Sequence, residues 1–253
     1  MNALDGSGIT RWGARLTVTG AVVALAAAAA MILAGIGYRI DLWHFRTGFM
    51  IMRWAFWFAL AAAVLSVAGL ILIRARPARM FATALIGIVV GAMAAYLPWS
   101  LKQTADSLPY IHDISTDTQD PPEFIAAAKL RKEGDHPVTY DGPEVATQQK
   151  QAYPDLAPLV SPAPKEKVFE AVKKAVAAMG MTLVEASPEE GRIEANQTSL
   201  LYGFVDDVVV RIVTTAGGSK VDVRSKSRVG RSDLGQNAKR IRIFLQELQS
   251  KLA

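Results

Sequence analysis

Residues 205–228, VDDVVVRIVTTAGGSKVDVRSKSR, have the composition of two β-strands joined by a glycine turn. Paired glycines favour a two-residue hairpin turn, here Gly217 and Gly218, and the position of the turn sets which residues face each other. The predicted register has four informative pairs: Ile212 with Val223, Arg211 with Arg224, Val209 with Lys226 and Asp207 with Arg228.

Side chains alternate between the two faces of a strand, so the hairpin has two distinct faces. The apolar face is expected to lie under the core: Val208, Val210, Ile212, Val221 and Val223. The opposite face, called the charged face below, is formed by Asp207, Arg211, Arg224, Lys226 and Arg228. Like charges directly opposed are unfavourable. The charged face therefore needs countercharge.

The remainder of residues 165–253 completes an antiparallel layer. Residues 165–180 have a helical apolar stripe ending at a glycine, residues 181–187 and 192–199 have strand composition, and an apolar stripe spaced by three and four follows Asp233. This order predicts an α+β domain of about four antiparallel strands with two helices packed on one face.

The start of the last helix carries capping residues. Ser232 or Asp233 can accept hydrogen bonds from the first turn, and Gln236 completes a capping-box pattern with Asp233. A helix N-terminus also attracts anions, and Arg228 and Arg231 are close to it in sequence.

Three segments, residues 16–37, 54–73 and 80–99, are apolar, lack ionisable residues and are long enough to cross a bilayer. Residues 1–102 are thus expected to form a membrane anchor. Gly87 and Gly91 in the third segment form a small-xxx-small pair, suited equally to packing within the anchor or to dimerisation.

Charge is unevenly distributed along the chain. Residues 1–102 have nine Lys or Arg and two Asp or Glu, whereas residues 103–253 have 19 and 21. The basic residues flank the membrane segments and give no support to nucleic-acid binding. Arg11, Arg15 and the RARPAR link at 74–79 predict a cytoplasmic N-terminus, with the C-terminal domain on the periplasmic side of a bacterial inner membrane.

Residues 103–164, called the wrapping segment, contain nine of the twelve prolines and cannot be mostly regular structure. One short helix is expected at residues 120–131, with Asp120 as its cap and Glu123 at its third position. Residues 103–204 contain nine bases and sixteen acids, so this part of the chain can supply countercharge to the charged face through Asp113, Asp117 and Asp120. The alternative is an external anion, such as acidic lipid headgroups, bound at the charged face and Arg231.

Several motifs together resemble one family. They are IHDISTD at 111–117, PPEF at 121–124, YPDLAPL at 153–159, and DDVVVRI with VDVRSKSRVGRSDLGQNAKRIRIFL between 206 and 245. This set resembles the family called domain of unknown function (DUF) 1499 over most of residues 105–250, and the three-span N-terminus is similar to an arrangement among bacterial members. The resemblance implies that the first and last motifs belong to one domain. It carries no reaction and no catalytic residues.

Catalytic signals are sparse. The chain has no cysteine, and it has no GxSxG, HExxH, P-loop or strand-associated GxGxxG motif. The remaining candidates are His112, Asp113 and Asp117, with Asp120 nearby, as a metal site or a general base. His136 lies in a polar loop and is expected to be solvated without a companion.

These patterns predict a non-enzymatic membrane protein that presents an interaction domain, without metal or cofactor. Its expected partners are the lipid bilayer and a membrane protein of a cell-envelope assembly. Two alternatives stay open: binding of an envelope anion or anionic lipid by the charged face, and a hydrolase or metal-dependent enzyme centred on His112 and Asp113.

Overall fold

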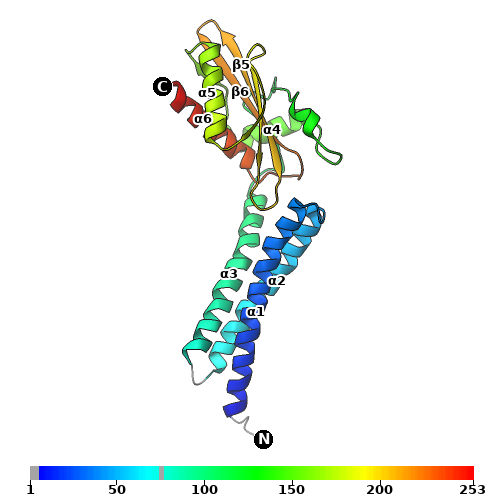
Figure 1. Ribbon diagram of the computed structural model, residues 1–253, viewed down its shortest axis with the longest axis vertical. Helices are drawn as coiled ribbons and strands as arrows, with labels where there is room; N and C mark the ends of the chain where they lie inside the picture. Colours follow the sequence, from blue (N-terminus) through cyan, green and yellow to red (C-terminus); the bar gives the residue numbers. More distant parts are fainter. Residues whose placement is uncertain (1–5, 74–76) are drawn as a thin grey trace. The chain divides into compact units, whose positions relative to one another are not determined.

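A computed structural model describes residues 6–73 and 77–253 (Figure 1). The chain divides into two compact units. The helical unit comprises Met1–Gln103 and Leu200–Gly203, and the sheet unit comprises Thr104–Ser199 and Phe204–Ala253.

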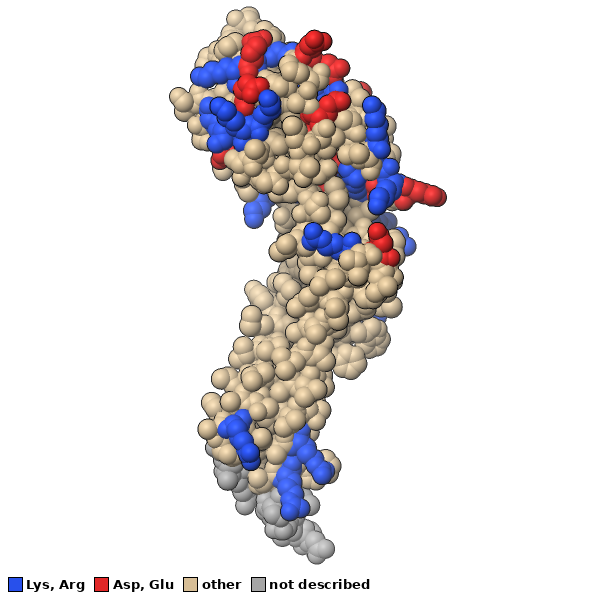
Figure 2. Space-filling model, viewed as in Figure 1, with Lys and Arg blue, Asp and Glu red and all other residues tan. Residues whose placement is uncertain are grey.

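The helical unit is formed by three long helices: α1 (Gly6–Arg39), α2 (Phe45–Leu72) and α3 (Ala78–Ser107). Each is long and apolar enough to cross a membrane, and each contains one predicted span, apart from Ile73, which caps the end of α2. Figure 2 shows no Lys, Arg, Asp or Glu on the visible surface of the middle of this unit. The helix α3 continues five residues past residue 102, so the first part of the wrapping segment is helical, unlike the prediction.

Glycine and alanine allow the three helices to approach closely. A Cβ added at Gly87 would lie 2.1 Å from Ser66 Oγ and 3.0 Å from Ala21 N, and one added at Gly91 would lie 2.8 Å from the carbonyl oxygen of Ala59. Gly87 and Gly91 therefore serve packing of α3 against α1 and α2 within one chain.

The sheet unit contains one antiparallel sheet. Its long strands are β3 (Thr182–Ser187), β4 (Arg192–Thr198), β5 (Val205–Thr215) and β6 (Gly218–Ser227), which follow one another as neighbours. Two three-residue strands from the wrapping segment, β1 (Asp113–Ser115) and β2 (Leu159–Ser161), pair with β6. They bring the sheet to six strands and cover the backbone groups of β6 that would otherwise form an open edge.

The predicted hairpin register is wrong by two residues. Thr215 pairs with Gly218, so the turn is at Ala216 and Gly217. Gly218 is the first residue of β6 and not part of the turn. A Cβ there would lie 2.2 Å from the carbonyl oxygen of Ser161 in β2, so glycine is needed for β2 to pair with β6. The observed pairs are Ile212 with Val221, Arg211 with Asp222, Val209 with Arg224 and Asp207 with Lys226. A shift of two preserves both faces but replaces the Arg211–Arg224 opposition with an ion pair.

The main core lies under the predicted apolar face. Helices α5 (Lys165–Ala178) and α6 (Gln236–Leu252) pack on this side of the sheet (Figure 1). The five residues predicted for this face are all at most 1% exposed. The α+β class with two helices on one face is confirmed.

Two predicted helix starts are wrong. Residues 120–131 contain only a short 3₁₀ turn, η1 (Ala127–Leu130), while α4 (Pro143–Ala152) is a further helix of the wrapping segment. The last helix begins at Gln236 with Gly235, at φ 75°, as its N-cap. Gln236 is thus the first helical residue, so the predicted capping box is absent.

The side chains predicted to cap α6 instead shape the turn before it. Asp233 accepts hydrogen bonds from the backbone N–H groups of Gly235 at 2.9 Å and Asn237 at 2.7 Å, and Ser232 Oγ accepts one from Leu234 N at 3.3 Å. Burial raises the pKa of Asp233, although these hydrogen bonds oppose the shift.

Replacing Gly91 with leucine should destabilise the helical unit by about 1–3 kcal/mol, because the side chain would overlap the backbone of α2. Gly8→Leu is the matched control, since a Cβ at Gly8 meets nothing within 4 Å. Circular dichroism during a titration with denaturing detergent measures the change. Equal midpoints for the two variants would contradict this packing.

Candidate functional site

The charged face is closed by the chain itself. Residues of the wrapping segment pack over it, and Phe124, Ala127 and Val209 form a small second core there with Val138. Six ionisable residues of this region are at most 1% exposed: Asp113, Glu194, Asp207, Asp222, Arg224 and Lys226. The face is therefore an interior layer with its own ion pairs.

Arg224 and Asp113 form the central pair. Arg224 Nε donates to Asp113 Oδ1 at 2.8 Å and Nη2 donates to Oδ2 at 2.7 Å, a two-bond geometry specific to guanidinium and carboxylate. The guanidinium also donates to the carbonyl oxygens of Pro122 at 3.1 Å and Val138 at 2.9 Å. Its carbon lies 4.9 Å from the centroid of the Phe124 ring, within cation–π distance.

Lys226 also has only internal partners. Its ammonium group lies 2.6 Å from Asp141 Oδ1, 2.7 Å from the carbonyl oxygen of Thr139 and 3.1 Å from Asp113 Oδ2. An ammonium group has three donors, and these three acceptors match them.

Other bases of the charged face have internal partners as well. Arg228 Nη2 lies 2.8 Å from Asp207 Oδ1, and Arg131 approaches the other oxygen of this carboxylate at 3.0 Å. Arg211 bridges Asp222 and Asp120, each at 2.9 Å. Arg231 is the exception: it is exposed and forms no ion pair with another described residue.

The countercharge is internal: Asp113, Asp120 and Asp141 come from the wrapping segment, whereas Asp207 and Asp222 come from the sheet itself. The alternative, in which the charged face binds an external anion, requires accessible guanidinium and ammonium groups. Arg224 is 1% exposed and Lys226 is fully buried, so neither can meet a lipid headgroup in this conformation.

The acids near His112 do not form the predicted cluster. Asp113 binds Arg224, Asp120 binds Arg211, and Asp117 accepts a hydrogen bond from Lys220 at 2.9 Å. Burial alone would raise the pKa of Asp117, but hydrogen bonds from the Asp120 backbone and Lys220 lower it overall.

Glu194 is a site residue that sequence reasoning missed. Its two carboxylate oxygens accept hydrogen bonds from the backbone N–H groups of Ile125 at 2.9 Å, Ala126 at 3.0 Å and Ala127 at 2.7 Å. A buried side chain of β4 thus supplies the cap that Asp120 was predicted to supply, and η1 begins there. The sequence does indicate the face on which Glu194 lies: it stands between the apolar residues Ile193 and Ala195, so strand alternation places it on the charged face.

The prediction that His136 is solvated and without a companion is wrong. Its ring stacks on that of His112 with centroids 4.0 Å apart, and its Nε2 lies 2.8 Å from the carbonyl oxygen of Gly230. His112 Nε2 lies 3.4 Å from Asp141 Oδ2, and Asp141 also binds Lys226. The five residues of this region are called the histidine corner: His112, His136, Tyr140, Asp141 and Lys226.

The histidine corner contains two buried polar atoms that form no hydrogen bond with the described residues. His112 Nε2 and Tyr140 Oη are buried, and neither makes a hydrogen bond with another described residue. Burial lowers the pKa of His112, the His136 ring lowers it further, and Asp141 opposes the shift. Burial also raises the pKa of Tyr140 to about 12. A neutral imidazole and a neutral phenol can exchange hydrogen bonds or a proton with a small polar group.

Metal binding has little geometric support. Within residues 6–73 and 77–253, no three His, Asp or Glu side chains are grouped so that they could hold a metal ion. Asp113 is also turned to Arg224 and away from a shared site with His112.

Comparison with known proteins identifies one family. Its model, described as Protein of unknown function (DUF1499), matches residues 113–248, more than half of the chain. The match covers β1, the charged face, most of α6 and the histidine corner except His112, which lies one residue before it. No curated protein and no solved structure matches the chain.

Removing Arg224 should leave Asp113 buried without its main partner. Arg224→Ala is therefore expected to lower the free energy of unfolding of the sheet unit by about 3–5 kcal/mol. Exposed Arg231→Ala is the matched control and should change it by less than about 0.5 kcal/mol. Pulse proteolysis of the full chain in urea and mild detergent measures both. Equal effects of the two substitutions would contradict a structural role for the pair.

Acidification should destabilise the sheet unit through His112. Because folding lowers the pKa of this imidazole, the unfolded chain binds more protons below about pH 6.5, and stability falls as the pH falls toward the lowered pKa. His112→Asn should therefore lose less stability between pH 7.5 and 5.5 than the unsubstituted chain. His44→Asn, in the helical unit, is the control. An unchanged pH dependence in His112→Asn would refute the assignment.

Proposed function

The chain belongs to the DUF1499 family, and from that premise we propose that it is a non-enzymatic membrane protein of the bacterial cell envelope. Its three apolar helices anchor it in the inner membrane, and its sheet unit is an interaction domain on the periplasmic side. The proposed partner is another membrane protein of an envelope assembly.

The closed charged face carries this proposal. The strongest candidate catalytic carboxylates, Asp113 and Asp117, are held by Arg224 and Lys220 within the fold. Groups paired in this way hold the wrapping segment on the sheet and are not free for chemistry.

One exposed surface of the sheet unit is suited to a protein partner. Val160 of β2 and Val213 of β5 both lie opposite Lys220 of β6, so the three side chains form a row across the sheet. Val160 is 71% exposed and Val213 is 45% exposed. Two exposed valines on the strands that flank β6 offer a partner an apolar contact, with the Lys220–Asp117 ion pair beside them.

The orientation rests on arginine placement. Arg11, Arg15 and the RARPAR link are at the two ends predicted to stay in the cytoplasm. Three spans then place the C-terminal sheet unit on the other side of the membrane.

A second candidate function is acid–base chemistry in the histidine corner. The observation in its favour is that His112 Nε2 and Tyr140 Oη are buried and have no hydrogen-bond partner among the described residues. Under this alternative, His112→Asn would lose function while keeping any protein contact.

The absence of cysteine from the sequence allows a single-cysteine test. Val160→Cys should react with a membrane-impermeant maleimide–benzophenone reagent in spheroplasts, and illumination should join it to a second membrane protein. Ala78→Cys, exposed at the start of α3, should react only after lysis.

The two parts of the proposal fail separately. Labelling of Ala78→Cys but not Val160→Cys in intact spheroplasts would reverse the orientation. Labelling of Val160→Cys without any cross-linked product, repeated at exposed Ser250→Cys, would refute the interaction role.

A further inference from the structure

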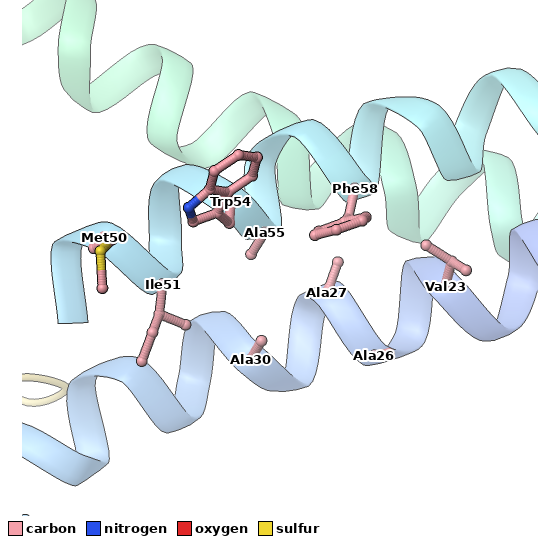
Figure 3. A pocket seen from close by; sticks show the side chains of 9 residues that line it. All are labelled: Val23, Ala26, Ala27, Ala30, Met50, Ile51, Trp54, Ala55 and Phe58. Atoms are coloured by element: carbon pink, nitrogen blue, oxygen red, sulfur yellow. The ribbon is translucent and has the colours of Figure 1, made fainter. Parts of the chain in front are cut away.

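An apolar groove of about 440 Å³ lies between α1 and α2 (Figure 3). Its lining comes from both helices: Val23, Ala26, Ala27 and Ala30 of α1, and Met50, Ile51, Trp54, Ala55 and Phe58 of α2. The alanine run at residues 26–30 leaves room along α1. The large α2 side chains do not fill it, since Met50, Trp54 and Phe58 are each more than half exposed.

We propose that this groove binds an acyl chain of an anionic phospholipid, whose phosphate contacts Arg46 and Arg53 of α2. The lipid belongs to the leaflet near the connection between α1 and α2. This site is separate from the charged face; it rests on the membrane anchoring proposed above but not on the proposed interaction role.

The shape of the groove favours an acyl chain over a protein helix. Close packing of membrane helices requires small residues on both surfaces, so that the backbones can approach. On α2 the groove presents Trp54 and Phe58, which would hold another backbone at a distance. A single hydrocarbon chain can lie between these rings and the alanine methyl groups of α1.

The groove is slightly shorter than one leaflet. On α2 it extends from Met50 to Phe58, which is about 12 Å of helix. Half of the hydrocarbon core of a bilayer is about 15 Å thick. Arg53 lies within this length, so the part of the groove from Trp54 to Phe58 can hold the section of an acyl chain nearest the headgroup.

Charge at one end of the groove selects an anionic headgroup. Arg46 precedes Met50 by one helical turn, and Arg53 follows it by three residues, so both flank the end of the groove that contains Met50. Both arginines are exposed, and neither forms an ion pair with another described residue. A long arginine side chain can extend along apolar surface until its guanidinium reaches the headgroup region.

Native mass spectrometry of the full chain in mild detergent tests the site. The probes are phosphatidylglycerol and phosphatidylcholine with identical acyl chains. Ala30→Leu fills the groove and should lower retention of phosphatidylglycerol about tenfold, the effect of displacing two buried methylene groups. Ala29→Leu, on the same helix but outside the groove lining, should retain it.

A second experiment tests recognition of the headgroup. Replacing Arg46 and Arg53 with glutamine should reduce the preference for phosphatidylglycerol over phosphatidylcholine at least about fivefold. The matched control, Arg11→Gln with Arg15→Gln, removes the same charge from the opposite end of α1.

The result that overturns the proposal is equal lipid retention by Ala30→Leu and Ala29→Leu. Ala26→Leu repeats the test at an exposed lining position, in case Ala30→Leu disturbs folding. A groove occupied by a second copy would also overturn it, and would appear as a dimer that Ala30→Leu dissociates. Loss of both lipids together in the arginine variant would refute the headgroup contact.

Discussion

A guanidinium and a carboxylate in the interior of the sheet unit, Arg224 and Asp113, join segments 111 residues apart. The pair holds β1 against β6, and the remaining donors of Arg224 hold the carbonyl oxygens of Pro122 and Val138. Burying two charges costs desolvation energy that their attraction only partly returns. The pair instead fixes the register of β6, because a one-residue slip would turn Arg224 into the apolar core.

The two units are stabilised by different means. In the helical unit, three apolar helices are held by close contact through glycine, alanine and serine, the kind of packing that associates helices in lipid. In the sheet unit, an apolar core on one face is combined with a layer of ion pairs on the other. The same chain thus contains a nearly uncharged interior and a strongly charged one.

Periodicity explains what could be predicted from the sequence. The three spans are long apolar runs, and both faces of the hairpin follow from alternation, which survives an error of two residues in register. The predicted register places Gly218 in the turn because paired glycines favour turns. In the structure the missing side chain of Gly218 makes room for β2. That requirement depends on a strand more than fifty residues away and leaves no local signal.

The site was predictable only in outline. The charged face and its acidic cover follow from charge and alternation, but individual partners depend on the path of the wrapping segment. Asp120 has the local pattern of a cap, yet it pairs with Arg211, and the three N–H groups bind Glu194 of a distant strand. His136 and Asp141 meet His112 through the same long-range folding.

The wrapping segment also has a consequence for biosynthesis. Asp113 leaves the ribosome 111 residues before Arg224, and β1 and β2 have no sheet to join until β6 follows. Contacts between such distant residues close late and slowly. We therefore expect the acidic segment to leave the ribosome unfolded and to remain exposed until synthesis is nearly complete. A chain that ended before β6 would contain the acidic residues but lack Arg224 and Lys226, which neutralise them. Its wrapping segment would stay unfolded and negatively charged, and therefore open to proteolysis.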